Sequence, residues 1–242
     1  MAAQTDFTEA GELMLFIDES QVTFLENMMW DQGYLDARQM AGAFQMLRTN
    51  DLIWSRYVHD YLMGERRPMS DLMAWNADST RMPHRMHSEY VRKLFLNNDL
   101  AQGRYEVRER PVALSDIRVP LFVVGTERDH VAPWRSVYKI LLLADTDVTF
   151  VLTSGGHNAG VVNPPGNERA SYRVSTKRDT DRYVDPDTWL EQTPVQKGSW
   201  WRAWLLWLTG HSGERTALPP MGNPERGYRL LHDAPGTYVL GE

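Results

Sequence analysis

Residues 119–160 read VPLFVVGTERDHVAPWRSVYKILLLADTDVTFVLTSGGHNAG, an order of strand, helix and strand. The stretch opens with a continuous apolar run over residues 119–124, which is typical of a strand buried on both faces in a parallel sheet. A helix is expected over residues 133–143 and a second apolar strand over residues 148–152. This β–α–β order predicts an α/β fold with two parallel neighbouring strands.

Two polar side chains follow these strands, Asp129 after the first and His157 after the second. α/β-Hydrolases deliver the acid and the base of a catalytic triad in this order. In such a pair the carboxylate binds one imidazole nitrogen and fixes the tautomer, so that the other nitrogen acts as the base. Gly155 and Gly156 would let the loop bring the ring back over the sheet edge. A helix cap at Asp129 and a turn at His157 are the plainer alternatives.

The nucleophile of a triad is missing from this sequence. No G-x-S-x-G elbow or cysteine equivalent precedes Asp129, and the chain has no cysteine at all. Ser154 and Ser212 are the tempting serines, but both follow Asp129, which reverses the expected order. A serine hydrolase or esterase that uses one of them is therefore the weakest of the functional hypotheses.

The composition is that of an ordinary soluble globular protein. Of the 242 residues, 42% are hydrophobic and 24% are charged, and the net charge of −6 argues against general nucleic-acid binding. The longest apolar stretch, residues 200–208, contains Arg202 and is far shorter than the roughly 20 residues of a membrane span. The absence of cysteine excludes disulfides and Cys-ligated zinc and is compatible with a cytoplasmic setting. Without a phosphate-binding loop or a zinc-protease motif, the sequence predicts no metal and no cofactor.

The chain divides into two parts by its hydrophobic period. Residues 1–103 are mostly helical in pattern, with apolar side chains at helical spacing, and they predict a helical cap or lid. Residues 104–242 are expected to form the C-terminal part of an α/β-hydrolase core. Within them, residues 164–198 are polar and loop-like, and the chain ends in a predicted hairpin with Pro235 and Gly236 at its turn.

Three further residues are candidates for substrate binding. His130 stands next to Asp129 and could hold a substrate or the loop, or be only a solvated neighbour. Trp75 and Asp78, in the segment WNADST, would line a pocket, although a simple turn explains this segment equally well.

Four tryptophans recur at helical spacing near the end of the chain: Trp200, Trp201, Trp204 and Trp207. They predict a helix that Ser199 caps and Gly210 ends. The pattern favours a helix packed against the core over a sticky surface for a polymer or lipid body.

Several long motifs resemble the polyhydroxyalkanoate (poly-3-hydroxybutyrate) synthases, which are acyltransferases of the α/β-hydrolase type. The segments ERDHVAPWRSVY and FVLTSGGHNAGVVNPPG resemble their C-terminal catalytic region. Upstream, DFTEAGELMLFIDESQV, LRTNDLIWSRYVHDYLMG and WNADSTRMP are similar to their cap, and downstream GSWWRAWLLWL and PGTYV also match. The resemblance covers nearly the whole chain.

This resemblance implies a reaction. These enzymes polymerise (R)-3-hydroxyacyl-CoA into a polyester and release CoA, so the CoA thioester is a substrate and no cofactor is implied. Asp129 and His157 then correspond to the family's catalytic Asp and His. His157 would deprotonate a cysteine that attacks the acyl thioester, and Asp129 would either orient His157 or activate the 3-hydroxyl group. Trp75 and Asp78 match a cap segment near the site.

One departure from the family is large, because its cysteine elbow lies upstream of the matching region. We therefore expect the C-terminal portion of a synthase, a partial α/β-hydrolase fold with its cap, which is inactive alone. It would self-associate or pair with the missing N-terminal half, in the cytoplasm and at the surface of polymer granules. The alternative is a non-catalytic partner that docks on a full synthase or on a granule.

Overall fold

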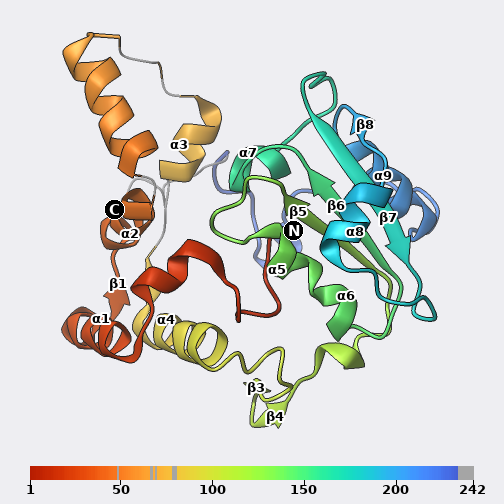
Figure 1. The fold of residues 1–242 in the computed structure, drawn as a ribbon, viewed down its shortest axis with the longest axis horizontal. Coiled ribbons are helices and arrows are strands. Elements are labelled where there is room, and N and C mark those ends of the chain that lie inside the picture. Colours follow the sequence, from red (N-terminus) through yellow and green to blue (C-terminus); the bar gives the residue numbers. More distant parts are fainter. Residues whose placement is uncertain (48, 66–67, 69, 78–80, 234–242) are drawn as a thin grey trace.

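The computed structural model describes residues 1–47, 49–65, 68, 70–77 and 81–233 of the chain. Figure 1 shows a sheet-containing part, formed by residues after about 120, beside a mostly helical part formed by the first hundred residues. The predicted hairpin turn at Pro235 and Gly236 and the candidate residue Asp78 lie outside the described residues.

The main sheet has four strands in sequence order: β5 (Leu121–Thr126), β6 (Val148–Thr153), β7 (Ser171–Lys177) and β8 (Gln196–Lys197). Strands β5 and β6 are parallel, as the sequence predicts, and the other two pairs are antiparallel. Helices and a mixed sheet together make this an α/β structure. The prediction of a loop over residues 164–198 is wrong, because β7, β8 and helix α8 (Pro186–Gln192) lie there.

Strand β6 is the centre of the core, and all six of its residues are buried. Successive side chains of a strand point to opposite faces, so β6 packs against helices on both sides. On one face, Val148, Phe150 and Leu152 join a cluster with α5 (Trp134–Tyr138), α6 (Ile140–Leu143) and α8. On the other, Val151 packs with Trp200, next to α9 (Trp201–Gly210).

The tryptophan-rich segment is a packed helix, as the spacing favours. Trp200 is fully buried, and its ring lies 6.3 Å from the ring of Phe122 on β5. The hydroxyl of Ser199 accepts a hydrogen bond from the Trp201 N–H at 3.1 Å, close to the predicted cap. Leu205 and Leu206 on the outer side of α9 are exposed.

The first hundred residues form short helices joined by brief strands, as the hydrophobic spacing predicts. Their elements are η1 (Gly11–Phe16), α1 (Glu19–Gln32), β1 (Tyr34–Leu35), α2 (Ala37–Leu47), η2 (Asn50–Trp54), η3 (Tyr57–Leu62), α3 (Asp71–Ala77), β2 (Met82–Pro83), α4 (His84–Tyr90) and η4 (Val91–Leu96). Beyond them lie the hairpin of β3 (Glu106–Val107) and β4 (Arg110–Pro111), then η5 (Leu114–Asp116), α7 (His157–Val161) and, near the end, η6 (Pro224–Arg226).

The helical part has a core of its own, in which Val22 of α1 packs with Leu94 and Phe95 of η4 and with Phe7. The first residues of the chain also reach the sheet. The Ala2 N–H donates to the carbonyl of Val124 at 2.7 Å, at the edge of β5 that faces away from β6. Residues 1–10 thus contact both parts, and the predicted division after residue 103 stays a prediction.

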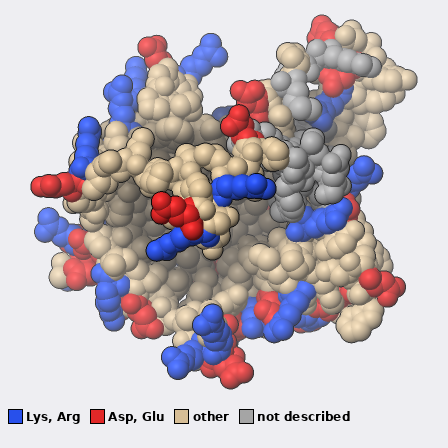
Figure 2. All heavy atoms as spheres, turned by 180° about the vertical axis from the view of Figure 1, so that it is seen from behind, with Lys and Arg blue, Asp and Glu red and all other residues tan. Residues whose placement is uncertain are grey.

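The surface and the helices bear on two expectations about partners. On the face in Figure 2, acidic and basic side chains are interspersed, in keeping with the small net charge of −6. Within the described ranges, every helix is too short or too polar to cross a membrane.

Candidate active site

Asp129 and His157 are in direct contact at the carboxyl ends of the two parallel strands. Asp129 lies in the loop after β5, and His157 is the first residue of α7, after β6. The imidazole Nδ1 is 2.9 Å from one carboxylate oxygen of Asp129 and 3.1 Å from the other. The hydrogen bond that the strand order predicts is therefore present, while a catalytic role for the pair stays a prediction.

The Asp129 carboxylate is buried and held by donors on several sides. It accepts hydrogen bonds from the hydroxyl of Thr126 at 3.1 Å and from the backbone N–H groups of Val131 and Ala132 at 2.9 and 2.8 Å. Burial alone raises the pKa of Asp129, but the hydrogen bonds from His157, Ala132 and Val131 and the charge of His157 together outweigh it, and the pKa falls below its ordinary value. The site therefore presents an ionised carboxylate to the imidazole.

The loop before α7 needs glycine at one of its two predicted positions. Gly155 has a φ of 112°, which side-chain-bearing residues rarely adopt. Gly156 has an extended conformation with a φ of −99°, so the loop path does not require glycine there. A third glycine, which the sequence did not single out, is Gly160 on α7. A Cβ at this position would lie 2.7 Å from the side chain of Thr126, so α7 packs directly on the end of β5.

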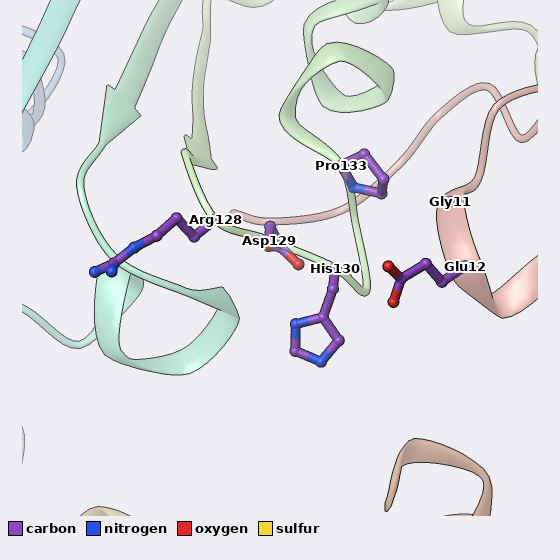
Figure 3. Close-up of a pocket in the computed structure, with 6 residues that line it drawn as sticks. All are labelled: Gly11, Glu12, Arg128, Asp129, His130 and Pro133. Carbon is purple, nitrogen blue, oxygen red and sulfur yellow. The ribbon is translucent and has the colours of Figure 1, made fainter. Parts of the chain in front are cut away.

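A pocket of about 370 Å³ opens beside the pair, where η1 meets the loop after β5. Its lining residues are Gly11, Glu12, Arg128, Asp129, His130 and Pro133. Figure 3 shows Glu12 reaching from η1 toward the loop of His130, while the Arg128 side chain extends the opposite way. His130 thus lines the pocket beside Asp129, and its predicted role in substrate binding stays a prediction.

The other residues singled out in the sequence are Trp75, Asp78, Ser154 and Ser212. Trp75 is on α3 with 62% of its surface exposed, and Asp78 falls outside the described residues. The hydroxyl of Ser154 accepts a hydrogen bond from the Ser171 N–H at 3.0 Å. The hydroxyl of Ser212 donates to the Leu208 carbonyl at the exposed end of α9. These contacts tie both hydroxyls to the backbone and give no support to a serine nucleophile.

Sequence analysis missed several groups that hold the site, above all Thr126 and the two backbone donors at Val131 and Ala132. The signal for Thr126 was its place at the end of a buried strand, three residues before Asp129. In the part of the chain that the structure describes, no group of three or more His, Asp or Glu side chains is arranged to hold a metal ion.

The sequence is similar to those of several known proteins. No protein-family model matches the chain. The chain is 39% identical over 237 residues to the poly(3-hydroxyalkanoate) polymerase subunit PhaC of Rhizobium etli, covering 98% of this chain and 36% of that protein. It is 42% identical over 241 residues to the poly(3-hydroxyalkanoate) polymerase of Methylorubrum extorquens, covering 99% and 39%. It is 35% identical over 240 residues to the PhaC subunit of Cupriavidus necator, covering 97% and 40%.

This chain is similar in sequence to part of the poly(3-hydroxyalkanoate) polymerases. The resemblance predicted from the motifs is thereby confirmed over nearly the whole chain. The chain spans about two fifths of the length of these relatives. The activity of the complete polymerases is therefore only proposed for this chain.

Proposed function

We propose that this chain forms the acid–base part of a polyhydroxyalkanoate synthase, an acyltransferase that polymerises (R)-3-hydroxyacyl-CoA and releases CoA. The contact between Asp129 and His157 at the ends of two parallel strands carries the proposal. In this view the chain is the C-terminal portion of such an enzyme. Its sheet is part of an α/β-hydrolase fold, and residues 1–103 form a helical cap.

The geometry supports His157 as a general base. When the Nδ1–H donates to Asp129, the lone pair of Nε2 is available to accept a proton. About a third of the His157 side chain is exposed, whereas the Asp129 side chain is fully buried, so the imidazole can reach a substrate that the carboxylate cannot.

The proposed reaction has two acyl transfers, and His157 accepts and returns a proton in each. First, Nε2 takes the proton of a cysteine thiol, the thiolate attacks the thioester carbonyl carbon, and CoA leaves with the proton returned by His157. Second, Nε2 takes the proton of a 3-hydroxyl group, whose oxygen attacks the acyl–cysteine thioester and forms the new ester bond; the cysteine thiolate leaves, and His157 returns the proton to it. The 242 residues contain no cysteine, so the thiol must come from polypeptide outside them. The thioester is a substrate, and the scheme needs no cofactor or metal.

The surroundings of Asp129 support an orienting role over direct activation of the 3-hydroxyl group. The carboxylate already accepts hydrogen bonds from Thr126, Val131, Ala132 and His157, and its side chain has no exposed surface. A substrate hydroxyl would have to displace one of these donors. We propose that substrate instead meets His157 and the pocket beside it, with His130 among the residues that hold it.

A chimaeric enzyme tests the proposal. The chain would replace the matching 237-residue region of the Rhizobium etli polymerase subunit, and CoA release from (R)-3-hydroxybutyryl-CoA would be measured. We expect turnover, and His157→Ala and Asp129→Asn should each lower kcat by about 10³- to 10⁴-fold, as in other acid–base triads. Ser154→Ala is the matched control and should keep turnover within a few-fold of the parent chimaera.

The chain by itself is the complementary test. The purified 242 residues should release no CoA above background, because no thiol is present to hold the acyl group. CoA release that His157→Ala abolishes would contradict this and favour a serine nucleophile. An active chimaera whose His157→Ala variant turns over normally would show that His157 is not the base. A chimaera that folds but has no turnover would favour the alternative of a non-catalytic partner that docks on a synthase or polymer granule.

A further inference from the structure

The helix that carries His157 is very short, and its far end is held by two tryptophans. Helix α7 has only five residues, His157–Val161. The indole N–H of Trp200 donates to the carbonyl of Gly160 at 3.0 Å, and that of Trp201 donates to the carbonyl of Val161 at 3.0 Å. These are carbonyl groups of the last turn, which have no partners within a helix of this length. The carbonyl of Val161 also accepts the N–H of Asn163, just beyond the helix, at 3.0 Å.

A third contact extends the same arrangement by two residues. The hydroxyl of Ser199 donates to the carbonyl of Asn163, a residue with only 2% of its surface exposed. The same hydroxyl accepts the N–H of Trp201 at 3.1 Å, which ties the donors to one another. Three consecutive residues, 199–201, therefore bind the segment that leaves α7.

On its other side α7 rests on the strand that precedes Asp129. A Cβ at Gly160 would lie 2.7 and 2.9 Å from side-chain atoms of Thr126, so the two backbones are as close as glycine allows. The hydroxyl of Thr126 donates in turn to Asp129, the partner of His157. Helix α7 thus contacts both the indole groups and the end of β5, whose Thr126 binds Asp129.

A helix of five residues is marginal in isolation, because nucleation fixes several residues for few hydrogen bonds. The direction of the His157 ring must therefore depend on what holds α7. We propose that Trp200 and Trp201 are positioning residues for His157, and that their indole N–H groups keep its Nδ1 on the Asp129 carboxylate. The catalytic meaning of this role rests on the proposed function, whereas the role itself is a property of the folded chain.

The test measures the His157 hydrogen bond directly, by NMR of the full chain with ¹⁵N-labelled histidine. The chain has seven histidines, and the Nδ1–H signal of His157 is assigned by its loss in His157→Gln. The main variant is Trp201→Phe, which keeps a ring but removes the indole donor. We expect its Nδ1–H proton to exchange with water about fivefold faster than in the parent, the effect of one net hydrogen bond.

Trp189→Phe is the matched control. Its indole N–H also donates one hydrogen bond, to the hydroxyl of Ser175 at 2.6 Å, and its ring is buried. Trp189 belongs to the cluster on the opposite face of the sheet from Trp200. This variant should lower the stability of the chain and leave the exchange rate of the His157 proton unchanged.

Two results would overturn the proposal: an exchange rate in Trp201→Phe equal to that of the parent, or an equal acceleration in Trp189→Phe. If Trp201→Phe does not fold, Ser199→Ala is used instead, because it removes the hydrogen bond from Ser199 to the Asn163 carbonyl. The His157 Nδ1–H proton should again exchange faster than in the parent, and an equal rate would overturn the proposal. No CoA substrate enters this measurement. A failed chimaera would therefore contradict the proposed function and leave this inference standing, and the reverse also holds.

Discussion

Strand β6 and the segment of η2 and η3 are both rich in apolar residues, yet their surroundings are opposite. All six residues of β6 are buried, between β5 and β7 and under helices on both faces. In residues 53–63 the large side chains are exposed: Ile53, Trp54, Tyr57, Val58, Tyr61, Leu62 and Met63. Figure 1 shows this segment, in orange, far from the sheet. The spacing of apolar residues along the sequence thus indicates a strand or a helix. Whether those residues are buried depends on the other elements that pack against them.

The largest stability contrast should come from truncating one aromatic ring in each region. Phe150 on β6 is fully buried and packs edge-on against Tyr138 and Trp189. Phe150→Ala should cost about 3–5 kcal/mol of unfolding free energy, from lost burial and the cavity left behind. Tyr61 is 75% exposed and stacks only on Tyr57 among the ring contacts of the described residues. Tyr61→Ala should stay within about 0.5 kcal/mol, measured by denaturant unfolding.

A large cost at Tyr61 would break the comparison. It would mean that the exposed aromatic segment is covered in solution, and light scattering over a range of concentrations would then show self-association. Large exposed apolar surfaces commonly mark such contacts. If the protein is a monodisperse monomer and Phe150→Ala and Tyr61→Ala have the stated effects on stability, residues 53–63 are exposed to solvent. The self-association expected from the sequence would then be wrong.

The parallel strands and the acid–base pair could be predicted because their signals are local. An apolar run indicates a strand, and a polar residue just beyond its end falls at the sheet edge. The run over residues 119–124 placed the strand two residues early and too deep: β5 is Leu121–Thr126, its first three residues are only partly buried at the edge of the sheet, and Val119 is exposed. Strand β7 was missed because its sequence, SYRVSTK, is polar at most positions. Its alternation of Tyr172 and Val174 with Ser171 and Arg173 carried the period-two signal. Helix α8 was also signalled, by Asp185 as cap before Pro186 at the first turn.

The residues that hold the site in place could not be predicted from local sequence patterns. The hydrogen bonds from Trp200 and Trp201 to α7 join residues 40 positions apart, and no spacing rule links them. The contact between Gly160 and Thr126 likewise joins residues of separate elements. Sequence reasoning therefore found the groups proposed to carry out the chemistry and missed the residues that hold them in place.

A second contrast applies the same substitution to one glycine in each region. Gly160→Ala would place a methyl group 2.7 Å from Thr126, inside the packing of α7 on β5, and should destabilise the chain by about 1–3 kcal/mol. Gly42 lies in α2, where a Cβ would meet nothing within 4 Å. Gly42→Ala should stabilise by up to about 1 kcal/mol, because alanine favours the helix. Thermal unfolding of both variants gives the signs.

Stability changes of the same sign in Gly160→Ala and Gly42→Ala would contradict this contrast between the two regions. A neutral Gly160→Ala would show that α7 can move off β5 without cost, which would also weaken the link from Thr126 to the His157 helix. The NMR signal of the His157 Nδ1–H in this variant distinguishes a shifted helix from a compensated one.

The smallest expected effect concerns two carboxylates, one in each region, that titrate below their ordinary range. Glu26 on α1 binds Arg92 of η4 at 2.7 Å. The hydrogen bond from Arg92 is the largest cause that lowers the pKa of Glu26 to about 2, against the opposing effect of burial. A depressed folded pKa adds stability that is present above the unfolded value of about 4.3 and is lost as pH falls through the folded value. The advantage of the parent over Glu26→Gln should therefore shrink between about pH 4.5 and pH 2.

The size of that advantage sharpens the comparison of the two regions. The side chains of Glu26 and Arg92 are 22% and 33% exposed, so solvent screens the pair, and Glu26→Gln should cost no more than about 1 kcal/mol at neutral pH. The pKa of Asp129, whose side chain is fully buried, is also lowered, so the advantage of the parent over Asp129→Asn should likewise shrink as pH falls. Unfolding free energies of the parent, Glu26→Gln and Asp129→Asn between pH 2 and pH 7 measure both. An advantage over Asp129→Asn that does not shrink as pH falls would contradict the assignment of Asp129 as an ionised partner of His157.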